Sequence, residues 1–462
     1  MTHPQLISVE KEVSSSCPDA AYKDLCLTIA NNLFRTYPSI DAIRQNEYRI
    51  NAYANLDTLG PPKDIHILQE EPALSIRKIK AAKCILEGKL FMEHAAAGEA
   101  TRLGMGTKYL IDIRNQLGMD TLAEQMSAAA GRTVSKKEII EKAGGSTEDL
   151  LPLSLGVRHM LQLSYDIYHM ALRFHANPET ILENQKMLII INAHSADTII
   201  REMMACRYFG FSRENVMFMI QKAYPGISFR NGIAFFDPSS PERLHNHGYI
   251  ALQQTMDDQI FYMDEFKRRC HLKADEFGNL LGMMNARIHS SIESLTYLTE
   301  SIDFESLGFS LEEGDRGARM VMEIVKNDPE NPQKGGMAAY DTRRGKNVMI
   351  EGFQLKNLPN EKITYLNKNF NYFPRPFDAW NRVKRFGIGM PVSVKKDHLY
   401  FQPVQGDMNF MLNTSFFQRE NVTPIEAWKS ISNTPIAIRA MLRQDRQDGF
   451  REYAESLIGK RL

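Results

Sequence analysis

The sequence lacks an excess of either charge, and it lacks paired cysteines. Lysine plus arginine and aspartate plus glutamate each number 56 among 462 residues, so the formal net charge at pH 7 is zero. A balanced charge gives little attraction to nucleic acids or to anionic membranes. The five cysteines are scattered and form no C-x-x-C pair. This spacing argues against a disulfide framework and against a cysteine-based zinc site.

Long apolar runs are also missing. The longest run of apolar residues, Met187 to Ile191, is far too short to cross a lipid bilayer. The first residues, MTHPQLISVEKEV, contain acidic side chains and no apolar stretch of signal-peptide length. We therefore expect a cytoplasmic protein that has neither a membrane nor a nucleic acid as its partner. Its oligomeric state does not follow from the sequence.

Length and pattern divide the chain into three expected regions. A chain of 462 residues is about three times the commonest domain length. Apolar residues recur at helical spacing over residues 18–50 and 72–86, which predicts a helical N-terminal region, residues 1–85. Residues 86–375 are expected to form the main α/β domain, and residues 376–462 a small α+β subdomain.

Two apolar segments predict buried parallel strands. Residues 89–97 read KLFMEHAAA, and residues 186–192 read KMLIIIN. Short continuous apolar runs are typical of strands that are covered on both faces. A helical pattern follows each run, and Ser195 is placed to cap a helix over residues 198–208. Strand, loop and helix units in series predict an α/β fold with a doubly wound, mainly parallel sheet.

The loop after the first of these strands carries the first candidate functional residues. It contains small residues followed by two cations: Ala96, Ala97, Gly98, Thr101, Arg102 and Lys108. Small side chains let backbone N–H groups approach a base or a phosphate, and the two cations can neutralise a triphosphate. The loop is not a Walker A sequence, because no Gly-Lys-Ser/Thr closes it. Taken alone, such a loop is more often ordinary turn chemistry.

The same loop resembles the signature of the sugar nucleotidyltransferases, G-G-x-G-T-R-L-G-x-x-x-P-K. Residues 97–108 read A-G-E-A-T-R-L-G-M-G-T-K, in which Thr-Arg-Leu-Gly is identical. Alanines replace two of the glycines, a threonine stands at the usual proline, and the loop is one residue shorter. The resemblance implies a nucleotide-binding loop in which Arg102 and Lys108 act as the catalytic cations, stabilising the triphosphate and the leaving group.

Two later segments resemble the eukaryotic-type UDP-sugar pyrophosphorylases. Residues 190–225 follow that family's order of strand, turn, helix, Y-F-G, strand and Q-x-x-x-P, and Gln221 falls on the glutamine that reads uracil. An amide suits this role because it donates and accepts hydrogen bonds together at a pyrimidine edge. Residues 244–249, LHNHGY, resemble the loop that closes on the nucleotide. The nucleotide contacts implied there come from His245, Asn246 and Gly248.

The family also holds magnesium through an aspartate in a V-D-N segment that ends a central strand. The corresponding residues here are Ile292-Glu293-Ser294, so the resemblance assigns the metal contact to Glu293 and Mg²⁺ as the cofactor. Glutamate is one methylene longer than aspartate, and a surface acid explains Glu293 equally well. In total the resemblance covers roughly residues 85–375.

What the resemblance implies is a GT-A-like, Rossmann-like fold and an enzyme that transfers the uridylyl group of UTP to a sugar 1-phosphate. A sugar-phosphate oxygen would attack the α-phosphorus of UTP in line, and pyrophosphate would leave. Three alternatives stay open: a nucleotidyltransferase with another nucleotide or acceptor, a nucleotide or nucleotide-sugar binding protein without catalysis, and a helical scaffold for protein partners. The last draws only on the helical ends and 24 methionines, which more often fill cores.

Overall fold

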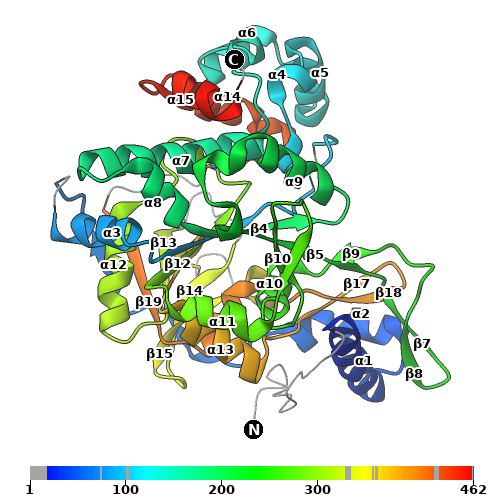
Figure 1. Ribbon diagram of the computed structural model, residues 1–462. Helices are drawn as coiled ribbons and strands as arrows, with labels where there is room; N and C mark the ends of the chain where they lie inside the picture. The colour runs from blue at the N-terminus through cyan, green and yellow to red at the C-terminus, as the bar shows by residue number, and fades with distance from the viewer. Residues whose placement is uncertain are drawn as a thin grey trace.

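A mixed β-sheet runs through the middle of the molecule, with helices on both of its faces (Figure 1). The computed structural model describes residues 18–72, 75–99, 103–327, 335–355, 358, 363–420, 426–459 and 461. In spatial order the main strands are β11 (Arg269–Leu272), β10 (Ile260–Met263), β5 (Val216–Gln221), β4 (Lys186–Asn192), β3 (Leu90–Ala95), β12 (Ala286–Ser291), β16 (Tyr365–Pro374), β13 (Met320–Lys326), β19 (Thr414–Arg419) and β2 (His66–Leu68). β14 (Met337–Asp341) pairs with β16, and β1 (Leu59–Gly60) and β15 (Lys346–Ile350) pair with β14.

Most strands of this sheet are parallel. β5, β4, β3 and β12 pair in parallel, and β13, β19 and β2 form a second parallel group. β16 joins the two groups and is antiparallel to both β12 and β13. The apolar segments 89–97 and 186–192 are β3 and β4, as predicted. The predicted α/β class with a mixed, mainly parallel sheet is therefore confirmed.

The apolar core lies on both faces of the sheet, because successive residues of a strand point to opposite sides. Met92 and Ile189 belong to the core beneath α7 (Leu155–Arg173), whereas Phe91 and Leu188 pack on the other side, against α11 (Ala274–Gly282) and α13 (Pro376–Phe386). The α7 side also carries α3 (Ile76–Leu86), α8 (Pro178–Asn184), α9 (Ala196–Ala205) and α12 (Phe304–Asp315), and the opposite side carries α10 (Asn246–Gln253). Burial on both faces explains why β3 and β4 are almost continuously apolar.

The helix after β4 begins two residues earlier than predicted, and Ser195 does not cap it. Ser195 precedes α9, but its hydroxyl donates a hydrogen bond of 2.8 Å to Asn192 Oδ1, and its side chain accepts none from the first turn. The strand-end amide of Asn192 thus takes the hydroxyl that the sequence pattern assigned to the helix.

The predicted helices at the start of the chain pack on a second, smaller sheet. α1 (Pro18–Thr36) lies against β7 (Ile227–Arg230) and β8 (Ile233–Phe236), and α2 (Ile40–Asn51) lies against β17 (Val392–Lys395). β18 (His398–Phe401) completes this four-stranded sheet, and β6 (Ala223–Tyr224) pairs with β9 (Arg243–Leu244) beside it. Figure 1 shows α1 and α2 next to β7, β8 and β17.

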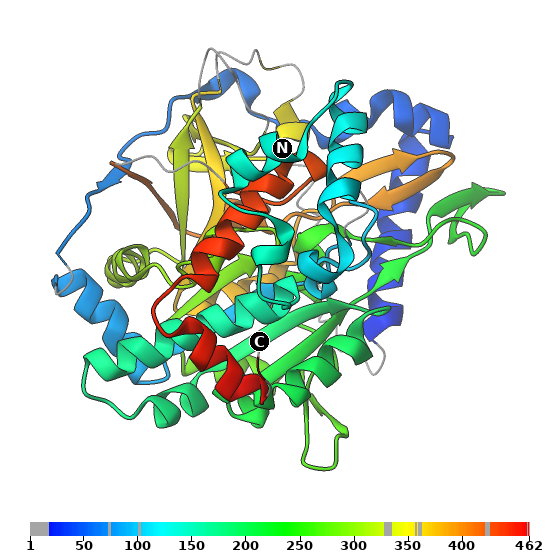
Figure 2. The ribbon, with the colours of Figure 1, turned by 90° about the horizontal axis from the view of Figure 1, so that it is seen from above.

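The end of the chain returns to the α7 side of the main sheet. Seen from above, α14 (Thr434–Asp445) and α15 (Phe450–Ile458) lie against α6 (Lys136–Ala143) and α7 (Figure 2). α4 (Ile113–Gln116) and α5 (Met119–Ala130) complete this group. Arg158 of α7, which is fully buried, forms an ion pair of 2.6 Å with Asp445 of α14. No helix of the described chain is long and apolar enough to span a membrane.

The division at residues 85 and 375 stays a prediction, but strands from all three expected regions lie in the main sheet. β2 comes from the expected N-terminal region, and β19 comes from the expected C-terminal subdomain. The two strands pair with each other, and β19 pairs with β13 of the middle region. Each terminal region thus contributes a strand to the central sheet.

Candidate functional site

The carboxyl ends of β3 and β12 mark the point where the chain order of the sheet reverses. From β3 the chain continues to β4 and β5 on one side, and it later returns to β12 on the other side. In open α/β sheets, ligands bind outside the carboxyl ends of the strands at such a switch point. The predicted nucleotide loop follows Ala95 of β3, and Glu293 follows Ser291 of β12, so both lie at this point.

Hydrogen bonds hold the described parts of the loop at both ends. The Ala96 N–H donates to Ile190 O at 2.8 Å, and the Lys108 N–H donates to Gly98 O at 3.2 Å. The amide of Asn192 donates to Ala97 O at 3.0 Å and to Thr107 Oγ1 at 3.2 Å. Because Ala96 uses its N–H within the sheet, that group is not available to a phosphate. Thr101 and Arg102, two of the predicted contacts, lie outside the described residues.

Asn192 is a site residue that the sequence reasoning missed. It ends β4, is 2% exposed, and connects the loop to Ser195, whose N–H donates to Asn192 Oδ1 at 2.9 Å. A buried amide at the end of an apolar strand needs partners at all its polar atoms. The signal that could have identified it is that a polar residue ends the apolar run KMLIIIN.

Lys108 and Glu293, predicted separately, form an ion pair in the structure. The Lys108 ammonium donates to Glu293 Oε1. The Lys108 side chain is 5% exposed and that of Glu293 is 37% exposed, so the cation is buried and the acid faces outward. The Trp428 N–H donates to Glu293 O at 2.9 Å, and the Leu295 N–H donates to Glu426 O at 3.0 Å. A C-terminal segment therefore fixes the loop that carries Glu293.

The donor set fits a magnesium ion that arrives with a nucleotide, not one held by the protein alone. Among the described residues, no three His, Cys, Asp or Glu side chains are grouped to hold a metal. Glu293 provides a single carboxylate, and Lys108 already contacts it. Mg²⁺ is commonly bound by one or two carboxylates together with substrate phosphates.

Gln221 lies at the carboxyl end of β5 beside the segment that was predicted to close on the nucleotide. Its side-chain N–H₂ group donates to Asn246 O at 3.1 Å. Its side-chain oxygen makes no hydrogen bond with the described residues, which leaves an acceptor for a ligand N–H. The structure thus brings Gln221, on the strand next to β4 in the sheet, into contact with Asn246 at the start of α10.

His245 contacts aromatic side chains. Its Nδ1 lies 2.7 Å from the hydroxyl of Tyr22 in α1, and its ring centroid lies 5.0 Å from that of Tyr224. Burial lowers the pKa of His245 to about 4, so the ring is neutral at pH 7. Its Nε2 is buried and has no hydrogen-bond partner in the described structure. The neutral ring of His245 can donate or accept a hydrogen bond, depending on its tautomer, but it does not provide a positive charge for a phosphate.

The segment 244–249 is not the loop that the resemblance implied. Leu244 ends β9, and α10 begins at Asn246. The next residues, Tyr249 and Ile250, are 1% and 2% exposed, so a helix buries the apolar side chains that follow the glycine. The Gly248 N–H donates to Pro403 O at 2.9 Å. A Cβ atom on Gly248 would lie 2.4 Å from the Pro403 carbonyl carbon, so only glycine fits this contact.

Replacing Gly248 with alanine is therefore expected to lower the free energy of unfolding by about 1–3 kcal/mol, because the new methyl group meets backbone atoms that cannot rotate away. Urea denaturation monitored by circular dichroism measures the change. Gly60→Ala is the matched control, since its Cβ would meet nothing within 4 Å. Equal losses in the two variants would contradict the close contact at Gly248.

A buried polar network beneath the switch point also escaped the sequence reasoning. Glu93 of β3, 1% exposed, accepts from Gln254 Nε2 at 2.5 Å and lies 3.5 Å from Arg287 Nη1. His289 Nδ1 lies 2.5 Å from Glu93 Oε1. Burial alone would raise the pKa of Glu93, but Arg287 and His289 outweigh it and lower the pKa to about 2. Its signal was a single acid within the apolar run KLFMEHAAA.

Comparison with known proteins finds solved structures with a similar fold. No protein-family model matches the sequence, and no curated protein matches it. Among solved structures, the UDP-N-acetylglucosamine pyrophosphorylase of Trypanosoma brucei, in complex with an inhibitor, is 13% identical with a TM-score of 0.57. That match covers 96% of this chain and 84% of the other.

Two further solved structures agree with this match. A putative UDP-N-acetylglucosamine pyrophosphorylase of Entamoeba histolytica is 13% identical over 82% of this chain and 86% of its own, with a TM-score of 0.53. A mutant form of the UDP-glucose pyrophosphorylase of Leishmania major is 13% identical over 92% of this chain and 79% of its own, with a TM-score of 0.54. The resemblance read from the sequence is thus confirmed at the level of structure: this chain has the fold of the UDP-sugar pyrophosphorylases.

Proposed function

We propose that the chain transfers the uridylyl group of UTP to a sugar 1-phosphate and releases pyrophosphate. The observation that carries the proposal is the meeting of Lys108 and Glu293 at the switch point of this fold. One structural neighbour, another mutant form of the Leishmania major UDP-glucose pyrophosphorylase, was solved in complex with UDP-glucose. The cytoplasmic location stays a prediction from the sequence.

Such a displacement needs positioning and charge neutralisation more than covalent help from protein groups. We assign Lys108 to the triphosphate, together with Arg102 outside the described residues. Gln221 offers its side-chain oxygen to the N3–H of uracil while Asn246 O holds its amide nitrogen. Mg²⁺ bound to the phosphates would offset the charge that develops on the leaving pyrophosphate.

The Lys108–Glu293 pair indicates how a nucleotide would enter. A triphosphate carries several negative charges, so it attracts Lys108 more strongly than a single half-exposed carboxylate does. Lys108 would then exchange Glu293 for phosphate oxygens, and Glu293 would be left to contact the nucleotide-borne Mg²⁺. Each of the two side chains would therefore have an oppositely charged partner both before and after the nucleotide binds.

A second candidate function, nucleotide binding without catalysis, is favoured by the same ion pair. In the structure the proposed catalytic cation already has a partner, and the loop carries alanines where glycines are usual. Both candidate functions require a nucleotide at the switch point. Only the first of them also requires that pyrophosphate is released.

The proposal predicts base selectivity that depends on Gln221. UTP is expected to bind at least about tenfold more tightly than CTP or ATP, because unsatisfied polar groups at the base edge cost about 1–3 kcal/mol. Gln221→Leu is expected to remove most of this preference. Isothermal titration calorimetry with the three nucleotides measures it, and Gln125→Leu, on the exposed surface of α5, is the matched control. Equal affinities of the wild type for all three nucleotides would contradict the uracil contact.

A further inference from the structure

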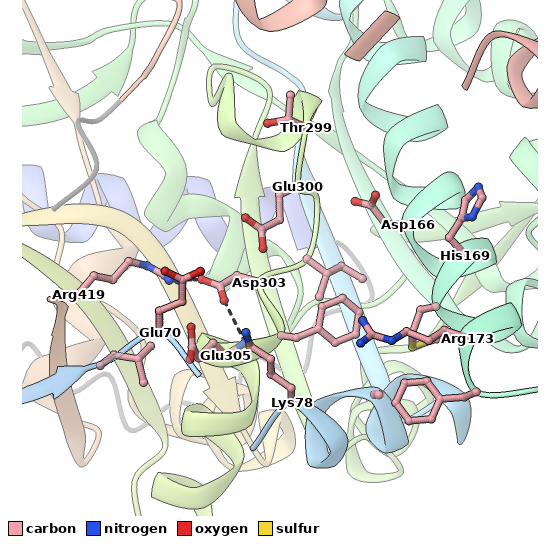
Figure 3. A pocket seen from close by; sticks show the side chains of 16 residues that line it. Glu70, Lys78, Asp166, His169, Arg173, Thr299, Glu300, Asp303, Glu305 and Arg419 are labelled. Atoms are coloured by element: carbon pink, nitrogen blue, oxygen red, sulfur yellow. Dashed lines mark hydrogen bonds and ion pairs between the residues drawn. The ribbon is translucent and has the colours of Figure 1, made fainter. Parts of the chain in front are cut away.

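A cavity of about 530 Å³ lies away from the switch point, on the α7 side of the sheet. It is bounded by the C-terminal half of α7, by α3, by the loop that leads into α12, and by the ends of β2 and β19 (Figure 3). None of its lining residues belongs to the loop 96–108, to β4 or to β5. The volume lies within the range of pockets that bind small molecules.

Part of the cavity wall is apolar, and part of it is charged. The apolar side chains are Leu68, Ala82, Met170, Phe174, Ile302 and Phe304. The lining contains five carboxylates and three basic side chains, so it carries an excess of negative charge when His169 is neutral. Such a field favours a ligand with positive charge over a free phosphate.

Several of the charged side chains already have structural partners. Asp303 pairs with Arg419, and Asp166 accepts from the Ser301 N–H at 2.8 Å and from the Ser301 hydroxyl at 2.6 Å. Glu305 accepts from the Glu71 N–H at 2.5 Å, and Lys78 donates to Glu71 O at 2.6 Å. These contacts hold the walls of the cavity together, so we do not assign them to a ligand.

Three charged side chains of the lining lack a direct partner among the described residues, although Glu70 and Glu300 both interact electrostatically with Arg419. Glu70, Arg173 and Glu300 line the cavity, yet none of them makes a side-chain hydrogen bond or ion pair with the described residues. Glu300 comes from the loop before α12, Glu70 follows β2, and Arg173 comes from α7 (Figure 3). The cavity therefore offers two carboxylates and one guanidinium group to an occupant.

We propose that this cavity binds a free basic amino acid, of the class of lysine or arginine. Its cationic groups would pair with Glu70 and Glu300, its carboxylate would pair with Arg173, and its methylene chain would lie on the apolar wall. Ion pairs between a carboxylate and guanidinium or ammonium groups are the strong, charge-assisted kind of hydrogen bond. A polyamine shares the ammonium groups and the aliphatic chain but has no carboxylate for Arg173.

The cavity and the candidate nucleotide site share one chain segment. The residues from Glu293 to Asp303 run from the switch point to the cavity wall. A bound amino acid would thus contact the segment that carries Glu293 without entering the candidate nucleotide site. We therefore expect it to act as an effector and not as a reactant. Amino-acid binding itself does not depend on the proposed nucleotidyl transfer.

Isothermal titration of the full-length protein without nucleotide tests the proposal, with L-lysine, L-arginine, L-glutamate and spermidine as probes. Lysine or arginine is expected to bind saturably, and glutamate is not. Glu300→Gln and Arg173→Ala should each lower the affinity for the amino acid about tenfold or more. Glu124→Gln, on the exposed surface of α5, should leave the affinity unchanged.

Spermidine distinguishes a polyamine from a basic amino acid as the ligand that supplies the ammonium group. If spermidine binds and neither basic amino acid does, or if Arg173→Ala leaves amino-acid affinity unchanged, the assignment of Arg173 to a carboxylate is overturned. Absence of binding by both amino acids overturns the proposal as a whole. Glu70, Arg173 and Glu300 are exposed, so their variants should keep the wild-type melting temperature. Glu70→Gln repeats the test should Glu300→Gln fail to fold.

Discussion

Replacing Lys108 with alanine is expected to weaken UTP binding about 10- to 100-fold, since a hydrogen bond to a charged group contributes about 1.5–3 kcal/mol. Lys108 is the cation of the described part of the nucleotide loop, and it is almost fully buried at the switch point. A buried cation interacts with phosphate more strongly than an exposed one because water screens it less. Isothermal titration calorimetry in the presence of Mg²⁺ measures the change.

The matched control is Lys137→Ala, on the exposed surface of α6, which should bind UTP like the wild type. Glu293→Gln is expected to change the UTP affinity in the opposite direction. Without Mg²⁺ this variant should bind UTP more tightly than the wild type, because Glu293 no longer competes with the phosphates for Lys108. Unchanged UTP affinity in Lys108→Ala, with the fold intact by circular dichroism, would remove Lys108 from the site.

Replacing Glu93 with glutamine is expected to lower the free energy of unfolding at pH 7 by about 3–5 kcal/mol, because the buried Arg287 loses its counter-charge. The pKa of Glu93 is lowered to about 2, below its ordinary value, so its ionised form stabilises the fold. That contribution is complete above the unfolded-state pKa and is lost as the pH falls through the folded-state value. The difference between wild type and variant should therefore shrink below about pH 4.5.

Urea denaturation at a series of pH values checks this expectation, with Glu141→Gln on the exposed surface of α6 as the control. A second variant that also replaces Arg287 with methionine should recover much of the loss, since it removes the unpaired charge. A loss below about 1 kcal/mol for Glu93→Gln alone, the size expected of an exposed pair, would mean that the network is not closed to water.

The sequence predicted those parts of the fold that leave a local pattern. β3 and β4 are continuous apolar runs because helices cover both of their faces, and α1 and α2 repeat apolar residues at helical spacing. β2 has three residues and little pattern of its own, and β19 lies 346 positions beyond it. Their pairing beside β13 depends on contacts between distant segments, which no local pattern encodes.

The candidate site divides in the same way. Resemblance selected Lys108, Gln221 and Glu293 one at a time, but the contact between Lys108 and Glu293 joins residues 185 positions apart. Segment 244–249 was predicted to be a loop because His245 and Gly248 fit a family motif. The glycine instead gives room for Pro403, a residue from the other end of the chain. Partners that come from distant segments are visible only in the folded molecule.

The most direct test of the central claim is pyrophosphate release from UTP in the presence of Mg²⁺ and a panel of sugar 1-phosphates. We expect release that requires both UTP and one of the sugar phosphates, that leaves a UDP-sugar as the second product, and that falls in Lys108→Ala. Binding of UTP without release from any member of the panel would contradict uridylyl transfer to a sugar 1-phosphate, and it would favour a nucleotide-binding protein.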